Sequence, residues 1–189
     1  MIQKELETYT RRTIAILEGR EVLRPGMIET PARVAKAWME WTSGYEADPE
    51  LILKTFEDGA ENYDEMVIVK EIPFYSHCEH HMAPFFGTAA IAYIPDGRIV
   101  GLSKLSRLLD CFARRFQVQE RITQQVTGAL MEHLQPKGAA CVIRARHLCM
   151  ESRGIKKAGS QTVTSSLQGV FREPAVRAEF FSLSKPDAL

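Results

Sequence analysis

Two groups of segments in this chain of 189 residues have the composition of β-strands. The first includes residues 65–78, EMVIVKEIPFYSHC, and the run FFGTAAIAYI, which Asp96-Gly97 separates from RIVGLS. β-branched and aromatic side chains favour strands, and an Asp-Gly pair between two such runs predicts a hairpin. The second group follows residue 138 and predicts three strands, AACVIRARHLC, SQTVTSSLQGVF and VRAEFFSLS.

Two amphipathic helices are predicted between these groups of strands. Apolar residues there recur at intervals of three and four, which is the helical period. Ser103 is suited to cap the first helix, and Pro136 with Gly138 closes the second. The residues that carry the period are Leu105, Leu108, Leu109, Phe112 and Phe116 in the first helix and Ile122, Val126, Leu130 and Leu134 in the second.

The N-terminal part of the chain is predicted to be helical as well. Residues 3–18 form one helix, and Thr30 with Pro31 begins another over PARVAKAWMEWTSG. The order of helices, strands, two helices and strands predicts an α+β fold with an antiparallel sheet. We therefore expect an N-terminal helical extension over residues 1–60 and a second domain over residues 61–189.

The charges and the N-terminus exclude several classes of partner. Lys and Arg together number 24, as do Asp and Glu, so no overall basic field exists to recruit nucleic acid or an anionic membrane. The first 19 residues mix charged and apolar side chains, which is typical of neither a signal peptide nor a membrane span. We expect a cytoplasmic protein without a nucleic-acid or membrane partner. In that reducing compartment the four cysteines are expected to be thiols or metal ligands.

The segment SHCEHH, residues 76–81, crowds three histidines around one cysteine. Cys78 and His81 have the C-x-x-H spacing that lets a sulfur and an imidazole bind one ion. Cys149 is a third candidate ligand, at the end of the predicted strand AACVIRARHLC. Two thiolates and one imidazole suit zinc, and three protein ligands leave a position for a water whose pKa falls to about 7. Spacing does not choose between His80 and His81 as ligand, and the other imidazole is available to carry protons.

A helix start with basic side chains is a candidate phosphate site. Lys104 and Arg107 follow Ser103 and are three residues apart on nearly one helical face. A helix N-terminus with added cations can hold phosphate, although an ordinary solvated face is the alternative. Further positive charge is available from Arg33, Lys36 and Arg153.

Glu120 has two interpretations. It lies at the start of the second predicted helix, where a carboxylate interacts favourably with the helix dipole. Alternatively, a carboxylate can accept two hydrogen bonds from a flat, amidine-like edge such as that of guanine.

The sequence resembles the GTP cyclohydrolase I family. The resemblance is carried by ETPARVAKAW, SHCEHHMAPFFG, YIPDGRIVGLSKLSR, RFQVQERIT, HLCMESRG and TVTSSLQGVF, in the family's order from about residue 25 to residue 171. It implies a tunnelling fold, with two helices on one face of an antiparallel sheet, behind an N-terminal helical extension. It also implies a toroidal decamer of two pentameric rings, with active sites between subunits. The implied activity is zinc-dependent opening of the guanine ring of GTP, release of formate and rearrangement to 7,8-dihydroneopterin triphosphate, the first step of tetrahydrofolate and pterin synthesis.

The resemblance implies a role for each candidate residue. One zinc ion per subunit would be bound by Cys78, His81 and Cys149. Proton transfer would involve His80, His147 and Ser103. Substrate contacts would come from Glu120 and Gln119 at the guanine and from Lys104, Arg107, Arg153, Arg33 and Lys36 at the triphosphate.

Two other functions are weighed against this one. A nitrile reductase of the same fold would need a thiol nucleophile without a three-ligand zinc site, and CEHH argues against it. A non-catalytic zinc-stapled binding module would need a closed site of four ligands, whereas the sequence offers three convincing ones.

Overall fold

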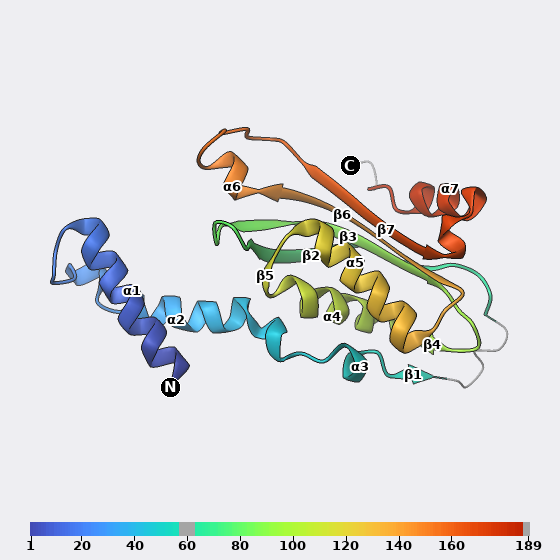
Figure 1. Ribbon diagram of the computed structural model, residues 1–189, viewed down its shortest axis with the longest axis horizontal. Helices are drawn as coiled ribbons and strands as arrows, with labels where there is room; N and C mark the ends of the chain where they lie inside the picture. The colour runs from blue at the N-terminus through green and yellow to red at the C-terminus, as the bar shows by residue number, and fades with distance from the viewer. Residues whose placement is uncertain (57–62, 187–189) are drawn as a thin grey trace. The chain divides into compact units, whose positions relative to one another are not determined.

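The computed structural model describes residues 1–56 and 63–186, and the chain divides into two compact units, Met1–Ser43 and Gly44–Leu189 (Figure 1). The domain boundary predicted between residues 60 and 61 lies outside the described residues. No helix in the described part of the chain is long and apolar enough to cross a membrane.

The N-terminal unit is helical, as the sequence predicts. Helix α1 covers Ile2–Glu18 and ends at Gly19, whose left-handed φ of 64° suits glycine. A 3-10 turn at Pro25–Met27 leads to α2, Thr30–Trp41, which packs against α1. The N-cap of α2 is Glu29, so Thr30 is the first helical residue and not the cap, and Pro31 stands in the first turn where a missing N–H costs nothing.

A five-stranded sheet forms the centre of the second unit, with strand order β5-β2-β3-β6-β7. The four long strands are antiparallel neighbours, as predicted, and the short β5 runs parallel to β2. The strands are β2 (Val67–Cys78), β3 (Pro84–Ile94), β5 (Phe116–Gln117), β6 (Gly138–His147) and β7 (Thr162–Gly169).

Two helices cover one face of this sheet, which confirms the predicted arrangement (Figure 1). They are α4, Leu102–Ala113, and α5, Gln119–Ala129, which continues as a π-helical turn at Leu130–Leu134. Their predicted apolar positions pack on the alternate residues of β3 and β6 that face them, as the two-residue period of strands requires. Phe116 is the exception, because α4 ends at Ala113 and Phe116 lies in β5. The most deeply buried of these positions are Leu105, Leu108, Leu109, Ile122, Val126, Leu130 and Leu134.

The start of α4 differs from the prediction. Gly101 is the N-cap and Leu102 is already helical, so Ser103 lies in the first turn and does not cap the helix. The amide of Lys104 donates to the Gly101 carbonyl at 2.8 Å, which closes this first turn. Gly101 has the extended backbone of an N-cap residue, with φ of −60° and ψ of 134°.

The opposite face of the sheet is covered in part by a helix that the sequence analysis predicted as a strand. Residues 174–183 form α7, Pro174–Leu183, after a 3-10 turn at Val170–Arg172. Pro174 stands in the first turn of the helix, and a strand would lose a ladder hydrogen bond there. Phe180 is fully buried and packs edge-on against Phe171 at 5.6 Å between ring centroids, over Ala92 and Val142. Burial of one helical face therefore outweighs the β-propensity of the run AEFF.

The predicted hairpin around Asp96-Gly97 is wrong in its pairing. Strand β4, Ile99–Val100, pairs with β1, Thr55–Phe56, in a separate two-stranded sheet. The end of β3 still holds β4, because the Tyr93 hydroxyl accepts a hydrogen bond from the Val100 amide at 3.2 Å. A short helix, α3 at Pro49–Ile52, precedes β1.

Candidate metal centre

A tight turn after β2 brings two of the predicted metal ligands together. Cys78 is the last residue of β2, and its carbonyl accepts from the amides of His81 at 3.3 Å and Met82 at 2.8 Å. Met82 closes the turn with a φ of 53°. This backbone places the His81 side chain beside the Cys78 thiol, with Nδ1 3.6 Å from Sγ.

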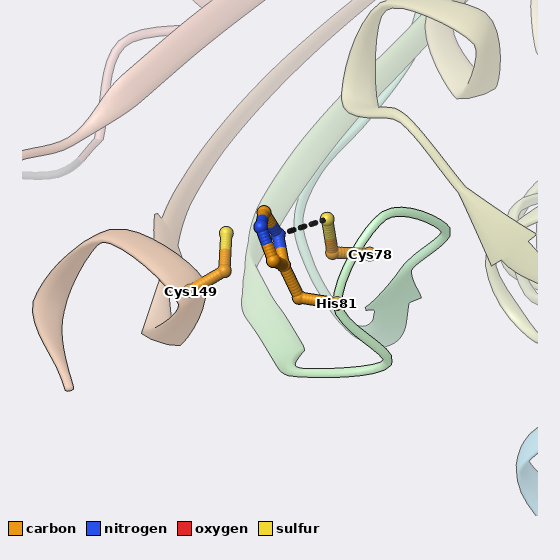
Figure 2. Close-up of side chains that lie close together, drawn as sticks. All are labelled: Cys78, His81 and Cys149. Carbon is orange, nitrogen blue, oxygen red and sulfur yellow. Dashed lines mark hydrogen bonds between the residues drawn. The ribbon is translucent and has the colours of Figure 1, made fainter. Parts of the chain in front are cut away.

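Cys149 approaches from the other side of β3. Strand β3 lies between β2 and β6, and its first residues pair His77 with Pro84 and Phe85 with His147. The ends of β2 and β6 therefore lie close together at one edge of the sheet. The predicted strand does not reach Cys149, because β6 ends at His147 and Cys149 lies in the one-turn helix α6, Leu148–Glu151. The bend points the Cys149 thiol toward His81 (Figure 2).

The donor atoms of Cys78, His81 and Cys149 all lie within 4.8 Å of one another. Tetrahedral zinc with thiolate and imidazole ligands holds its donors about 3.5 to 3.8 Å apart. The Cys78–His81 distance already matches this range, and side-chain shifts on the order of 1 Å close the others. In the described part of the chain, no other set of three cysteine, histidine or carboxylate side chains converges in this way. The residues therefore fit a metal ion of the soft, tetrahedral kind.

His80 stays outside this set although it neighbours it. Its Nδ1 lies 3.7 Å from the Cys78 thiol, but the group that includes Cys149 uses His81. The His80 side chain is 63% exposed, and its Nε2 is 3.8 Å from a carboxylate oxygen of Glu79. His80 is thus an exposed imidazole at the edge of the metal centre.

Two arginine–glutamate pairs hold the segments that carry the ligands. Arg121 on α5 binds Glu79 through two hydrogen bonds of 2.6 and 3.1 Å, and Arg146 on β6 binds Glu151 on α6 through two of 3.0 and 2.6 Å. Each guanidinium lowers the pKa of its glutamate partner. Bidentate pairs of this kind fix geometry as well as adding energy. Neither pair was predicted. Arg121 and Glu79 are 42 residues apart, and the five-residue separation of Arg146 and Glu151 is not the spacing of neighbours on a helix face or a strand face.

His147 stands at the end of β6, half-buried against the same edge. Its ring stacks on Phe85 with centroids 4.6 Å apart and planes 4° from parallel. Its Nε2 lies 2.8 Å from Oε1 of Gln119, the first residue of α5. Burial lowers the pKa of His147, and the nearby carboxylates of Glu120 and Glu151 oppose that shift. Glu120 is exposed in the first turn of α5, and its negative charge acts on His147.

The structure does not bring the predicted phosphate ligands of α4 to the metal centre. Ser103 lies just after Val100, which is held by Tyr93 near the far end of β3, whereas the metal ligands lie near Pro84 at its start. Nine residues of strand separate the two ends, which is roughly 30 Å. Lys104 and Arg107 lie on the same first turns of α4 as Ser103.

The remaining predicted cations fall in two places. Arg153 follows α6. Burial and the neighbouring Cys78 thiol raise the pKa of Cys149, and the positive charge of Arg153 opposes that shift. Arg33 and Lys36 lie on α2, in the N-terminal unit, and both are exposed.

Comparison with known proteins gives consistent matches along most of the chain. The model of the GTP cyclohydrolase I family matches residues 7–185. GTP cyclohydrolase 1 of Nitrosospira multiformis is 59% identical over 168 residues, which cover 88% of this chain and 88% of that protein. GTP cyclohydrolase 1 of Janthinobacterium sp. is 60% identical over 168 residues, covering 88% of this chain and 85% of that protein.

A more distant relative and a solved structure extend these matches. GTP cyclohydrolase 1 of Thermobifida fusca is 52% identical over 175 residues, which cover 91% of this chain and 84% of that protein. The crystal structure of the archaeosine synthase QueF-Like in the apo form is similar with a TM-score of 0.44 and 14% identity. That similarity covers 55% of this chain and 93% of the other.

Proposed function

The chain belongs to the GTP cyclohydrolase I family, and on that premise we propose how its residues carry out the family's reaction. The reaction opens the five-membered ring of the guanine of GTP, releases carbon 8 as formate and rearranges the rest to 7,8-dihydroneopterin triphosphate. The observation that carries the proposal is the convergence of Cys78, His81 and Cys149 within 4.8 Å at the sheet edge that also presents His80, His147 and Glu120.

We assign one zinc ion per chain to Cys78, His81 and Cys149. When bound, zinc supplies a Lewis acid that makes water a nucleophile near neutral pH. Three protein ligands leave one position open, which is the pattern of catalytic rather than structural zinc. A closed, non-catalytic zinc module would need a fourth ligand, and the described residues supply three.

The imidazoles at this edge handle the protons. Ring opening adds one water to carbon 8 and transfers a proton to nitrogen 7, which leaves carbon 8 as a formamide. A second water then hydrolyses this formamide, so that carbon 8 leaves as formate. His80 is exposed beside Cys78, so we assign it the proton delivered to nitrogen 7. His147 is half-buried and is held by Phe85 and Gln119. We assign it proton exchange with the substrate near the five-membered ring of guanine. Ser103 is assigned to the later rearrangement of the ribose.

Recognition of GTP divides between its two ends. Glu120 is assigned to the guanine edge, because an exposed carboxylate beside His147 can accept two hydrogen bonds from the amide and amine of guanine. The triphosphate is assigned to the basic residues Lys104, Arg107, Arg153, Arg33 and Lys36.

A site of this kind needs more than one copy of the chain. Within one chain, Ser103, Lys104 and Arg107 belong to the end of the sheet opposite the metal centre. The α4 start of one subunit can complete the metal centre of a neighbour. This separation supports a homo-oligomer with active sites between subunits, which we assign as the toroidal decamer, in the cytoplasm.

Product analysis tests the proposed function. Purified protein is incubated with GTP, and formate and pterin fluorescence are measured together. We expect the two products in equal amounts from wild type and neither from Cys149→Ala. Formate without a pterin, or full turnover by Cys149→Ala, would contradict the proposal.

A further inference from the structure

Both ends of the Gln119 side-chain amide have hydrogen-bond partners within the chain. It is 1% exposed at the first position of α5. Its Nε2 lies 3.1 Å from each of three acceptors, the carbonyl oxygens of Ile143 and Thr162 and the hydroxyl of Thr164. Its Oε1 lies 2.8 Å from Nε2 of His147. The amide therefore joins α5 to β6 and β7 and ends on a histidine of the proposed active site.

These partners fix the orientation of the amide. Main-chain carbonyls can only accept hydrogen bonds, so the end of Gln119 that faces Ile143 and Thr162 must be the NH₂ group. The other end, the amide oxygen, then faces His147 and can only accept. Nε2 of His147 must consequently carry a hydrogen, in the neutral ring as well as in the imidazolium.

The His147 ring has little freedom to escape this arrangement. Phe85 stacks on its face at 4.6 Å with planes 4° from parallel, and the two residues are register partners in the β3–β6 ladder. A 180° flip of the ring would keep the stacking but would place a carbon where Nε2 lies and break the hydrogen bond to Gln119, and any smaller rotation would disturb the stacking. Nδ1 is thus the nitrogen that is left for proton exchange.

We propose that Gln119 is a positioning residue that holds the neutral ring of His147 in the tautomer protonated at Nε2, so that Nδ1 is the nitrogen whose lone pair is left for the substrate. This role replaces the contact with guanine that the sequence analysis assigned to Gln119. Its kinetic consequence rests on the proposed function, whereas the tautomer does not.

The tautomer can be measured directly in the zinc-loaded protein. Magic-angle-spinning NMR of protein labelled with ¹⁵N-histidine distinguishes protonated from unprotonated ring nitrogens whatever the size of the assembly. The His147 signals are identified by their loss in His147→Asn, at pH 8, where imidazole is largely neutral. Wild type should show His147 with Nε2 protonated and Nδ1 unprotonated. A proton on Nδ1 in wild type would overturn the proposal, even if no variant folds.

Two matched variants separate positioning from general stability. Gln119→Met removes the amide that contacts His147, whereas Gln117→Met removes a comparably buried amide, 2% exposed, that bonds Phe112, Gln125 and Arg121 instead. We expect a mixture of His147 tautomers in Gln119→Met and the wild-type tautomer in Gln117→Met. An unchanged His147 spectrum in folded Gln119→Met would overturn the proposal. Thr164→Val, which keeps both carbonyl acceptors of Gln119, should retain the wild-type tautomer.

Kinetics distinguish positioning from substrate contact. If Gln119 only positions His147, Gln119→Met should lower kcat about 10-fold to 100-fold with KM for GTP changed less than about 3-fold, at unchanged zinc content. A large rise in KM with kcat unchanged would instead show direct substrate binding and overturn the proposal. Absence of GTP turnover in wild type would refute the proposed function, and the NMR result would still decide the tautomer.

Discussion

Glu120 is the residue whose two interpretations lead to different measurements. As a helix-start charge it would contribute about 0.3 to 1 kcal/mol to stability and hardly affect the choice of substrate. As the reader of guanine it accepts hydrogen bonds that an amide cannot match. The carboxylate is exposed, and its charge opposes the lowering of the His147 pKa by burial, which supports the proposed role in reading the guanine edge.

We predict that Glu120→Gln folds and retains zinc while GTP turnover collapses. The mismatch costs roughly 1 to 3 kcal/mol or more in the complex, which is a loss of about 5-fold to 150-fold or greater. Wild type should also reject inosine triphosphate, which lacks the exocyclic amine. The control is Glu132→Gln, which changes an exposed glutamate, 76% exposed, in the π-helical turn beyond α5. Normal GTP turnover by Glu120→Gln, or equal use of both nucleotides by wild type, would remove Glu120 from the guanine site.

At the residue scale, local spacing in the sequence predicts only those site residues that are near one another in the chain. The pair Cys78 and His81 follows from C-x-x-H, and the structure brings Cys149 to them although it lies in a helical turn and not on the predicted strand. The task of Gln119 could not be predicted, because its partners on β6 and β7 are 24 to 45 residues away. Contacts of that kind follow from the fold and leave no periodic pattern.

At the scale of elements, the helical turn α6 carries the proposed metal ligand Cys149 and is tied to β6 by the pair of Arg146 and Glu151. Arg146 and Glu151 are joined by two hydrogen bonds, and the arginine lowers the pKa of the glutamate. Because that pKa is lowered, the stabilising contribution of the pair is present above the unfolded pKa of about 4.3 and is lost as the pH falls through the folded value. The pair is therefore intact at neutral pH.

We predict that Arg146→Gln releases zinc about 10-fold to 100-fold faster than wild type, because Cys149 loses the constraint on its turn. Zinc release into a chromogenic chelator at pH 7.5 measures this directly. Arg114→Gln is the matched control, since it removes an arginine–aspartate pair at the C-terminal end of α4, with Asp110 at 3.5 Å, and α4 carries no proposed metal ligand. Equal release rates for Arg146→Gln and wild type would show that the pair does not hold the ligand turn.

Elements with a long, regular period were predicted correctly, whereas elements decided by tertiary contacts were not. The apolar stripe of Ile122, Val126, Leu130 and Leu134 predicted α5 and the π-helical turn after it. The prediction was correct because the packing of the sheet buries every one of these positions. Helix α7 was predicted as a strand because its short aromatic run suits either structure, and packing of Phe180 on Phe171 decides between them. The partner of β4 is β1, more than 40 residues earlier, and the Asp96-Gly97 pair could not reveal it.

At the scale of the whole molecule, the separation between α4's first turn and the metal centre predicts complementation between defective subunits. Cys149→Ala lacks a metal ligand and Arg107→Ala lacks a proposed phosphate ligand, so each alone should be inactive or nearly so. If one site takes its metal centre from one chain and its α4 from another, mixed assemblies contain intact sites. Random mixing of equal amounts should restore roughly a quarter of wild-type activity.

The mixing experiment has an internal control. Cys149→Ala mixed with Cys78→Ala should remain inactive, because both defects affect the same half of the site. Activity that stays at the sum of the separate variants after Cys149→Ala and Arg107→Ala are refolded together would show that each chain builds its own complete site.

The most direct test of the whole account is a zinc titration of the metal-stripped protein, with zinc content and formate release from GTP measured at each step. The account predicts that activity rises in proportion to bound zinc and reaches its plateau at one zinc per chain, while Cys149→Ala neither gains activity nor binds zinc at that stoichiometry. Full activity in the stripped protein, or a plateau unrelated to occupancy of Cys78, His81 and Cys149, would contradict it.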